Sequence, residues 1–366
     1  MPSPKPPEKS AGTPSTATGR SALLCTAERT SDSPLFVGVD TGGTSTRCVV
    51  ATLDGAPVGY GRGPGGNQWS SGGGWADSLG AVLAQALDGL DPGRVRGGHI
   101  GMAGIAGPAR ARAQTMVDAA WSAQGLTGQA GLGPDITVGF AAGSAEAEGL
   151  LLLAGTGAVA AWVRDGELVH RCDGFGWWLG DEGSAVWLGR AALRNVLYAL
   201  DGRGAATGLT ARVARVMLGE EVPEHPQELA AALVTQVYAA APATVGRLAP
   251  QVQYAAEAGD EVAAGILAEA ADRLLASLRA AHRAAGERRL PVVLAGSVLT
   301  TAGPLSATVR AAVAEQYQVE PALARSGVAG ATALALRAAG LDLERLREVH
   351  AELLRRCEPL ESLAGG

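Results

Sequence analysis

Asp40-Thr41-Gly42-Gly43-Thr44-Ser45-Thr46 is the most informative stretch of the chain. Residues 35–40 before the glycines and 46–53 after them are mostly apolar, which predicts two buried strands joined by a tight turn. Glycines at such a turn let backbone N–H groups approach a phosphate without a Cβ in the way, and the hydroxyls of Thr44 and Thr46 add donors. Asp40, at the end of the first strand, is placed to hold a hydrated Mg²⁺. An ordinary Gly-Gly hairpin has the same pattern.

The stretch Leu153-Ala154-Gly155-Thr156-Gly157 repeats this arrangement in the middle of the chain. Over residues 35–61 and again over 150–170, the order is an apolar strand, a glycine–threonine turn, a second strand, an Asp-Gly turn and a third strand. This pattern predicts the internal duplication of one supersecondary unit, with a nucleotide held in a cleft between two related lobes. The alternation of strands and helices in the rest of the chain indicates an α/β fold.

Three segments are expected along the chain. Residues 1–33 are rich in Pro, Ser, Thr and Ala and lack apolar periodicity, which predicts a disordered tail. Residues 34–148 are expected to form an N-terminal lobe with the first phosphate loop, a sugar loop and the catalytic carboxylate. Residues 149–366 are expected to form a C-terminal lobe with the second phosphate loop, an adenosine site and the terminal helices.

Composition and charge exclude several classes of protein. The 366 residues are 47% hydrophobic, which is enough for a large core, and the formal net charge is -6. Because Lys and Arg are scattered, nucleic acid is not an expected partner. No apolar run reaches about 18 residues and no apolar segment follows the N-terminal lysines, so neither a membrane span nor a signal peptide is predicted. The four cysteines form no Cys-x-x-Cys pair, which indicates reduced thiols and a cytoplasmic protein.

Residues 174–184, Gly-Phe-Gly-Trp-Trp-Leu-Gly-Asp-Glu-Gly-Ser, have the composition of a sugar-binding segment. The face of Trp177 suits the apolar side of a pyranose, and the carboxylates of Asp181 and Glu182 suit its hydroxyl groups. The alternative is a helix that begins at Ser184, favours acidic residues through its dipole and buries the tryptophans in the core. Asn67-Gln68-Trp69 is a weaker polar and aromatic cluster of the same kind.

Two further stretches are candidates for the chemistry of phosphate transfer. Transfer to a sugar hydroxyl needs a carboxylate that accepts the proton, and Asp135, at the end of a predicted strand, is the candidate general base. The alternative is an ordinary loop aspartate after Pro134. The strand that ends at Leu294-Ala295-Gly296-Ser297 offers a flat backbone surface for adenosine, or is a simple turn. The chain contains neither the Gly-x-x-x-x-Gly-Lys-Ser/Thr phosphate loop nor the dinucleotide-binding fingerprint.

In their order along the chain, these motifs resemble the N-acetylglucosamine kinase and BadF-type ATPase family of the actin-like ATPase class. The motifs that carry the resemblance, over about residues 35–340, are residues 40–46, Ala154-Gly155-Thr156-Gly157, Gly180-Asp181-Glu182-Gly183-Ser184 and Leu294-Ala295-Gly296-Ser297. The resemblance implies a duplicated, two-lobed ribonuclease-H-like fold that binds ATP, Mg²⁺ and a sugar between its lobes and closes during turnover. The composition and the tryptophan–acid run look most like those of actinobacterial glucosamine kinases.

The resemblance also implies roles for individual residues. Asp40 takes a Mg²⁺-linked role, Asn67 and Asp181 match the sugar-binding residues, and Gly296 and Ser297 lie near adenosine. The residues expected to contact the phosphates, from the motifs and the resemblance together, are Gly42, Gly43, Thr44, Thr46, Gly155, Thr156 and Gly157.

The chain departs from the family pattern at the catalytic aspartate. In mammalian-type N-acetylglucosamine kinases, this residue directly precedes an Ala-Ala-Gly-Ser run, where this chain has Phe140. In other members the catalytic aspartate lies five residues before the position that corresponds to Phe140. That register gives Asp135 and preserves the distance to Gly155-Thr156-Gly157 better, so Asp135 is the preferred base.

A second departure concerns the substrate. Val159 stands where N-acetylglucosamine kinases have an Asn near the acetamido group, so glucosamine is the expected substrate and N-acetylglucosamine the alternative. The ammonium group of glucosamine would need to pair with a carboxylate, such as that of Asp181, Glu182 or Asp173.

Two alternative functions, from other classes of protein, stay open. A BadF-like ATPase activator would need paired cysteine ligands for a shared cluster, and the cysteine spacing argues against them. A non-catalytic sugar sensor would keep the fold without the base. The oligomeric state is also open, with a homodimer as one option.

Overall fold

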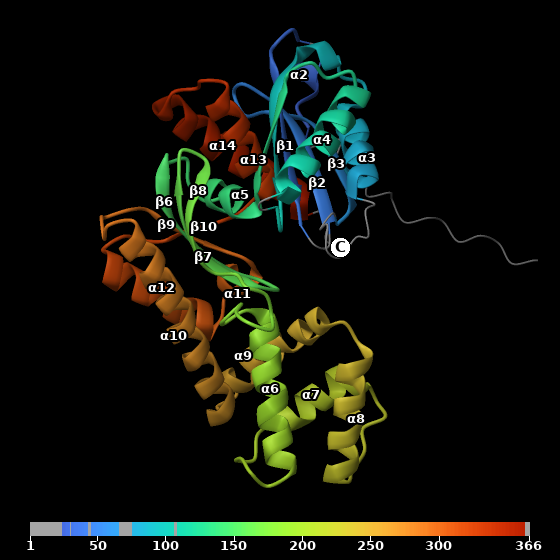
Figure 1. Ribbon diagram of the computed structural model, residues 1–366, viewed down its shortest axis with the longest axis vertical. Helices are drawn as coiled ribbons and strands as arrows, with labels where there is room; N and C mark the ends of the chain where they lie inside the picture. Colours follow the sequence, from blue (N-terminus) through green and yellow to red (C-terminus); the bar gives the residue numbers. More distant parts are fainter. Residues whose placement is uncertain (1–23, 30, 43–44, 66–74, 106–107, 363–366) are drawn as a thin grey trace, which may run out of the picture.

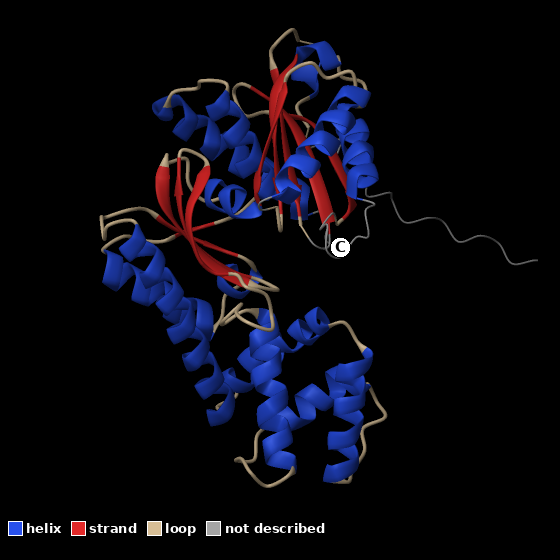
Figure 2. Ribbon diagram, in the orientation of Figure 1, coloured by secondary structure: helices blue, strands red, loops and turns tan. Residues whose placement is uncertain are grey.

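The computed structural model describes residues 24–29, 31–42, 45–65, 75–105 and 108–362. Two five-stranded sheets, separated in space, form the framework of the molecule (Figures 1 and 2). The strand order is β3-β2-β1-β4-β5 in the first sheet and β10-β9-β6-β7-β8 in the second. The strands of the first sheet are β1 (Leu35–Thr41), β2 (Ser45–Thr52), β3 (Pro57–Pro64), β4 (Val95–Met102) and β5 (Gln129–Pro134). Those of the second sheet are β6 (Glu148–Ala154), β7 (Ala158–Arg164), β8 (Glu167–Asp173), β9 (Val292–Ala295) and β10 (Ala322–Leu323).

The two sheets have the same topology, which confirms the predicted two-lobed α/β architecture. In each, three consecutive strands form an antiparallel meander, and the first of them also pairs with a parallel strand. A further parallel strand completes each sheet. Since the carboxyl ends of parallel strands meet at one edge, each lobe presents one such edge for a site.

Helices from both ends of the chain cover the first sheet. α3 (Trp75–Leu87) and α4 (Pro108–Ala123) belong to the core on one face, while α13 (Gly327–Ala338) and α14 (Leu343–Ser362) pack on the other face. A Cβ on Gly38 of β1 would overlap Thr332 of α13, so this contact is direct. α13 and α14, which lie in the expected C-terminal segment 149–366, thus bury the second face of the first sheet.

Helix α5 (Asp135–Ala141) lies between the lobes. Its Ile136 and Phe140 belong to a buried cluster with strands of the second sheet, whereas Val138 and Ala141 pack against α13. The helix that begins at Asp135 is therefore fixed by both halves of the molecule.

The second lobe has a helical extension at the end of the molecule that lies away from the first sheet (Figure 1). Here α10 (Glu261–Ala284) packs on strands of the second sheet and also on α6 (Ala185–Leu200), α9 (Ala249–Glu257) and α12 (Pro304–Tyr317). The helices of this lobe are α6 (Ala185–Leu200), α7 (Leu209–Leu218), α8 (Pro226–Ala239), α9 (Ala249–Glu257), α10 (Glu261–Ala284), α11 (Ser297–Thr300) and α12 (Pro304–Tyr317). Two short 3-10 turns are η1 (Pro92–Arg94) and η2 (Pro242–Leu248). Among the described helices, none is both long and apolar enough to cross a bilayer.

The end of the N-terminal segment is ordered, contrary to the expected tail up to residue 33. α2 (Thr26–Arg29) lies against the first lobe, where the N–H of Cys25 donates to the carbonyl of Pro57. The buried guanidinium of Arg94 donates to the carbonyls of Glu28, Arg29 and Ser33. These contacts supply partners that the polar composition of the segment does not reveal. Residues 1–23 lie outside the described part of the chain.

Candidate active site

Two carboxylates lie at the carboxyl edge of the first sheet. Asp40 is the penultimate residue of β1, and Asp135 directly follows β5. Both strands run parallel to β4, which lies between them. Asp135 is the first residue of α5 and not the last of a strand, because the strand ends one residue earlier, at Pro134.

The two carboxylates affect each other electrostatically. Burial first, and the nearby charge of Asp40 second, raise the pKa of Asp135 to about 6, although the N–H of Ile136, 3.0 Å from Oδ1, opposes the shift. Burial also raises the pKa of Asp40, and Arg47 opposes that shift. A carboxylate with a pKa near 6 is ionised at neutral pH and still basic enough to take a proton from a hydroxyl group.

The site fits Mg²⁺ in the way in which this ion usually binds next to phosphates. Mg²⁺ keeps several waters and uses one or two carboxylates together with phosphate oxygens. Asp40 and Asp135 repel each other, and a cation held at Asp40 would relieve that repulsion. Among the described residues, no three or more His, Cys, Asp or Glu side chains are grouped so that they could hold a metal ion alone. Asp40 is the residue that would hold the ion.

Three residues that the sequence analysis did not single out surround Asp40. Arg47 lies directly opposite Asp40 in the β1–β2 register, and Glu361 of α14 forms an ion pair with Arg47 at 3.2 Å. A Cβ on Gly327, the first residue of α13, would overlap Asp40 Oδ2. Arg47 could have been found from its cross-strand position. Glu361 and Gly327 are too distant in sequence for any local pattern to connect them with Asp40.

The first phosphate loop is only partly described. Gly43, Thr44 and Asn67 lie outside the described residues. Gly42 donates to the carbonyl of Ser45 at 3.0 Å, so the hairpin closes as expected. Thr46 is buried and lies opposite Thr41, on the other face of the hairpin from Asp40, and its Oγ1 has no hydrogen-bond partner in the described chain.

The second phosphate loop is a tight turn between β6 and β7. The N–H of Gly155 donates to the carbonyl of Gly157 at 2.8 Å, so this donor is used inside the turn. The first N–H of α6, from Ala185, donates to the carbonyl of Gly155 at 2.8 Å. Thr156 is exposed at the tip of the turn. The turn therefore offers Thr156 and the tip of its backbone to a ligand.

The predicted adenosine strand lies beside this turn. Gly296 has a φ of +82°, and a Cβ there would overlap the carbonyl oxygen of Ala154. Glycine is required for both reasons. The adjacent Ser297 is exposed. The structure thus brings Gly155 and Gly296 together, 3.8 Å apart when measured from a Cβ built on Gly155 to the Gly296 Cα.

Asp181 lies against the same turn. A Cβ on Gly157 would be 2.8 Å from Asp181 Oδ2, so the carboxylate lies against the bare glycine backbone. Burial raises the pKa of Asp181, while the N–H groups of Ala158 and Gly176 oppose the shift. Asp181 is partly exposed, so its carboxylate is accessible to a ligand.

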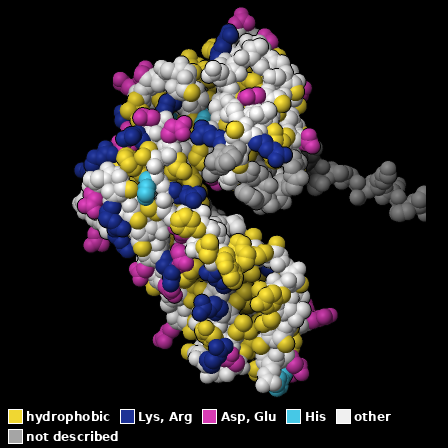
Figure 3. All heavy atoms as spheres, viewed as in Figure 1, with side chains coloured by type: hydrophobic (Ala, Val, Ile, Leu, Met, Phe, Trp, Pro, Cys, Tyr) yellow, Lys and Arg dark blue, Asp and Glu magenta, His cyan; other side chains and the backbone are white. Residues whose placement is uncertain are grey.

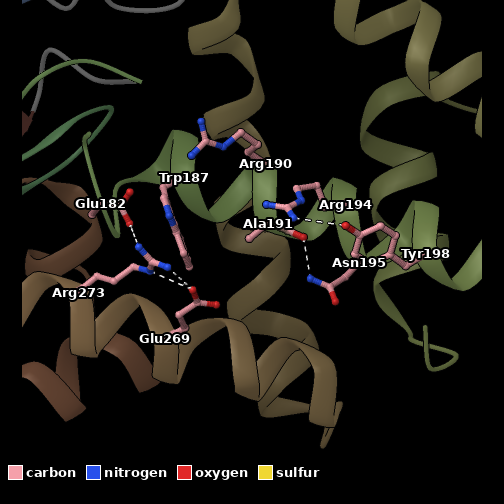
Figure 4. Close-up of a pocket in the computed structure, with 9 residues that line it drawn as sticks. All are labelled: Glu182, Trp187, Arg190, Ala191, Arg194, Asn195, Tyr198, Glu269 and Arg273. Carbon is pink, nitrogen blue, oxygen red and sulfur yellow. Dashed lines mark hydrogen bonds and ion pairs between the residues drawn. The ribbon is translucent and has the colours of Figure 1, made fainter. Parts of the chain in front are cut away.

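Glu182 points to another part of the lobe. Its carboxylate forms an ion pair with Arg273 of α10, which also binds Glu269 at 2.6 Å (Figure 4). These residues line a surface pocket of about 470 Å³ between α6 and α10. Glu182 is therefore already engaged, and the structure separates it from Asp181.

The aromatic part of the segment is exposed. The exposed fractions are 61% for Phe175, 42% for Trp177, 75% for Trp178 and 78% for Leu179. Arg190 of α6 donates to the carbonyl of Trp177 at 2.6 Å. The alternative interpretation required both tryptophans to be core residues, and they are not. In the space-filling view, the surface is hollowed between the upper lobe and the lower, helical part, where hydrophobic side chains gather (Figure 3).

One buried cluster connects the two groups of residues. Ile136, next to Asp135, packs in the same cluster as Val159 of β7. Val159 lies opposite Asp173 in the β7–β8 register and against Gly174. The amino end of α5 and the base of the 174–184 segment are thus neighbours.

Comparison with known proteins agrees with this arrangement. N-acetyl-D-glucosamine kinase of Dictyostelium discoideum is 26% identical over 303 residues, which cover 77% of this chain and 91% of that protein. The structure of a candidate N-acetylglucosamine kinase from Chromobacterium violaceum has a TM-score of 0.61 at 24% identity and covers 83% of this chain and 99% of its own. A glucokinase of the ROK family from Streptomyces griseus, solved with glucose and AMPPNP, has a TM-score of 0.52 at 17% identity, with 83% and 99% coverage. These two structures establish the shared fold.

The family model that matches the chain extends over residues 37–335, from β1 to α13. This range includes both glycine turns, both carboxylates of the first lobe, and Asp181. The chain belongs to the BadF/BadG/BcrA/BcrD ATPase family.

Proposed function

We propose that this protein is a sugar kinase that transfers the γ-phosphoryl group of ATP to a hydroxyl of an amino sugar, with glucosamine as substrate and glucosamine 6-phosphate as product. The observation that carries the proposal is Asp135, a carboxylate of raised pKa beside Asp40, at the amino end of the helix that joins both lobes. The similarity to a curated N-acetyl-D-glucosamine kinase supports the reaction class.

Each group has a defined part in the reaction. Asp135 accepts the proton of the sugar hydroxyl as its oxygen attacks the γ-phosphorus. Asp181 binds a second hydroxyl and sets the orientation of the ring. Thr156 and the turn around it face the phosphates, Gly296 and Ser297 face adenosine, and Asp40 would hold Mg²⁺ together with water. Such an ion would supply positive charge that offsets the charge of the phosphate oxygens.

The preference for glucosamine rests on Val159. This side chain is buried and apolar, belongs to the same buried cluster as Ile136, and lies against Gly174. An acetamido group there would find no hydrogen-bonding partner on Val159 and would lose its bonds to water. N-acetylglucosamine remains the second candidate because the curated relative acts on that sugar.

A coupled ADP-release assay with ATP and Mg²⁺ tests the proposal. The panel contains glucosamine, N-acetylglucosamine, glucose, mannose and N-acetylmannosamine, with the Asp135→Asn variant as control. Turnover that is confined to glucosamine and abolished in the variant supports the full proposal. Turnover on N-acetylglucosamine retains the kinase and rejects the argument from Val159. Absence of sugar-dependent ADP from folded protein rejects the kinase and favours the sensor or activator.

A further inference from the structure

Asp173 holds the turn that carries Asp181. One oxygen of its carboxylate, Oδ1, accepts the N–H of Asp181 at 2.8 Å, and the other, Oδ2, accepts the N–H of Glu182 at 2.8 Å. Hydrogen bonds from backbone N–H groups to an ionised carboxylate are about twice as strong as those between neutral groups. Both oxygens of one side chain thus fix two consecutive peptide units.

The backbone of this segment is unusual at both ends. Asp173 has a φ of +66° and Asp181 a φ of +56°, in a region that non-glycine residues rarely adopt. Such conformations persist only where the surroundings determine them, and they gather at functional sites. At Asp181, the hydrogen bonds to Asp173 hold the backbone in this conformation. They also connect the end of β8 directly with the candidate sugar ligand.

Close packing continues from Asp173 to the phosphate turn. A Cβ on Gly180 would overlap Asp173 Oδ1, so only glycine lets the carboxylate reach the next N–H. The side chain of Asp181 then lies against Gly157. The chain of contacts runs from Asp173 through Gly180 and Asp181 to the second phosphate loop, and a displacement at its first member changes where the Asp181 carboxylate points.

The outer side of the segment is held separately. Arg190 binds the carbonyl of Trp177, and Arg273 binds Glu182. These contacts come from α6 and α10 and leave the Asp181 carboxylate untouched. Among these residues only Asp173 accepts the N–H of Asp181, so its removal would free that donor, while the N–H of Ser184 still bonds to the carbonyl of Asp181 and the segment stays attached.

We propose that Asp173 is a positioning residue for sugar binding, which acts by fixing the direction of the Asp181 carboxylate. This inference rests on the proposed function, because it assumes that Asp181 contacts the sugar. It assigns Asp173 a role in sugar affinity without contact with the sugar and separates it from Glu182, whose partner is Arg273.

Sugar and ATP kinetics of Asp173→Ala and Asp173→Asn test the proposal. For Asp173→Ala, loss of both charge-assisted hydrogen bonds should raise KM for the sugar by about tenfold or more, with KM for ATP changed by less than about twofold. Asp173→Asn keeps one acceptor oxygen and should lie between the wild type and Asp173→Ala. Unchanged sugar KM in Asp173→Ala, or an equal rise in both KM values, would overturn the proposal.

The matched control is Asp260→Ala in the same lobe. The carboxylate of Asp260 also bonds to backbone N–H groups, of Gly208 at 2.6 Å and Ala263 at 2.8 Å, but it caps α10 away from the glycine turns. Its loss should lower the melting temperature and leave KM for the sugar at the wild-type value. A sugar defect in Asp260→Ala equal to that of Asp173→Ala would show that both effects come from general destabilisation, and the proposal would fail.

A double variant separates positioning from other roles. If Asp173 acts through Asp181, the double variant Asp173→Ala/Asp181→Ala should have the same sugar KM as Asp181→Ala alone. If the two residues act independently, the factors by which the single variants raise the sugar KM should multiply in the double variant. Sugar-induced change in tryptophan fluorescence gives the affinities without turnover. The proposed function is judged first on the wild type. If the wild type is inactive and binds no sugar, the proposed function is rejected. If the wild type is active and the double variant shows the product of the two single effects on sugar KM, only the role of Asp173 is rejected.

Discussion

At the scale of single residues, the site depends on carboxylates whose surroundings differ. Asp135 is partly desolvated and lies near Asp40, Asp181 lies against a glycine turn, and Glu182 is neutralised by Arg273. Residue type alone made Asp181 and Glu182 equivalent in the sequence. Their different partners assign them different roles, and the first three predictions follow from this difference.

Asp135→Asn should reduce kcat strongly while sugar binding persists. The amide keeps the shape of the side chain but cannot accept the hydroxyl proton, and general-base catalysis contributes about 10²–10⁴-fold. The ADP-release assay measures kcat, and tryptophan fluorescence measures sugar affinity. Near-normal turnover in this variant would remove Asp135 from the role of base.

The raised pKa of Asp135 predicts how activity and stability depend on pH. As a base it must be ionised, so kcat/KM should fall as pH drops below about 6, and not only below about 4 as for an ordinary Asp. The folded state binds this proton more tightly than the unfolded chain does. The contribution of Asp135 to the free energy of unfolding therefore falls as pH rises from about 4 to about 6. Asp135→Asn should therefore be more stable than the wild type at pH 8 by about 1–2 kcal/mol, since partial exposure reduces the full effect of the shift. Equal unfolding free energies of the two proteins at pH 8 would contradict this prediction.

Asp181→Ala should weaken sugar binding more than it slows the chemical step. The variant removes a charge-assisted hydrogen bond, which is worth about 1.5–3 kcal/mol, or roughly 10- to 150-fold in affinity. Sugar titrations followed by fluorescence measure the effect, with Glu182→Ala as control, because Glu182 binds Arg273. Unchanged sugar affinity in Asp181→Ala would reject its assignment.

At the scale of elements, local patterns predicted the strands and turns well but not the partners of distant segments. Alternating and apolar runs around Gly42 and Gly155 predicted both antiparallel meanders, because turn-forming residues and side-chain burial leave a pattern in the local sequence. The packing of α14 on the first lobe and the contact of Glu361 with Arg47 were not predictable, because they join residues more than 300 positions apart. The order of α2 was missed for the same reason: its partner, Arg94, lies on another element.

The element α2 gives a prediction on stability. Removing residues 1–23 should leave the melting temperature nearly unchanged, whereas removing residues 1–33 should lower it, because Arg94 then loses three carbonyl partners while buried. A buried cation without partners costs about 1–3 kcal/mol or more. Arg94→Ala in the full chain serves as comparison and should show a loss of the same kind. Equal melting temperatures for both truncations would show that the α2 contacts do not contribute.

At the scale of the whole molecule, the two lobes meet where α5 and α13 cross. A Cβ on Gly330 of α13 would lie 2.6 Å from the carbonyl oxygen of Val138 and 2.6 Å from the backbone nitrogen of Ala142, so glycine permits the approach of the two helices. The chain passes between lobes beside this crossing, since Arg325 donates to the carbonyl of Ala142 at 3.1 Å. Asp135 lies at the other end of α5, so the packing at Gly330 sets the position of the base relative to both sheets.

Gly330→Ala should therefore lower both stability and kcat. The added methyl group must push α5 and α13 apart, and overpacking of this kind costs about 1–3 kcal/mol. Gly265→Ala is the matched control, because Gly265 lies within α10, is exposed, and has no atom within 4 Å of the added Cβ. That control should be neutral or stabilising by up to about 1 kcal/mol, as expected for alanine in a helix. Thermal unfolding and the ADP-release assay measure both variants. If Gly330→Ala matched Gly265→Ala in both, the crossing would tolerate separation, and the position of Asp135 would have to be set by the first sheet alone.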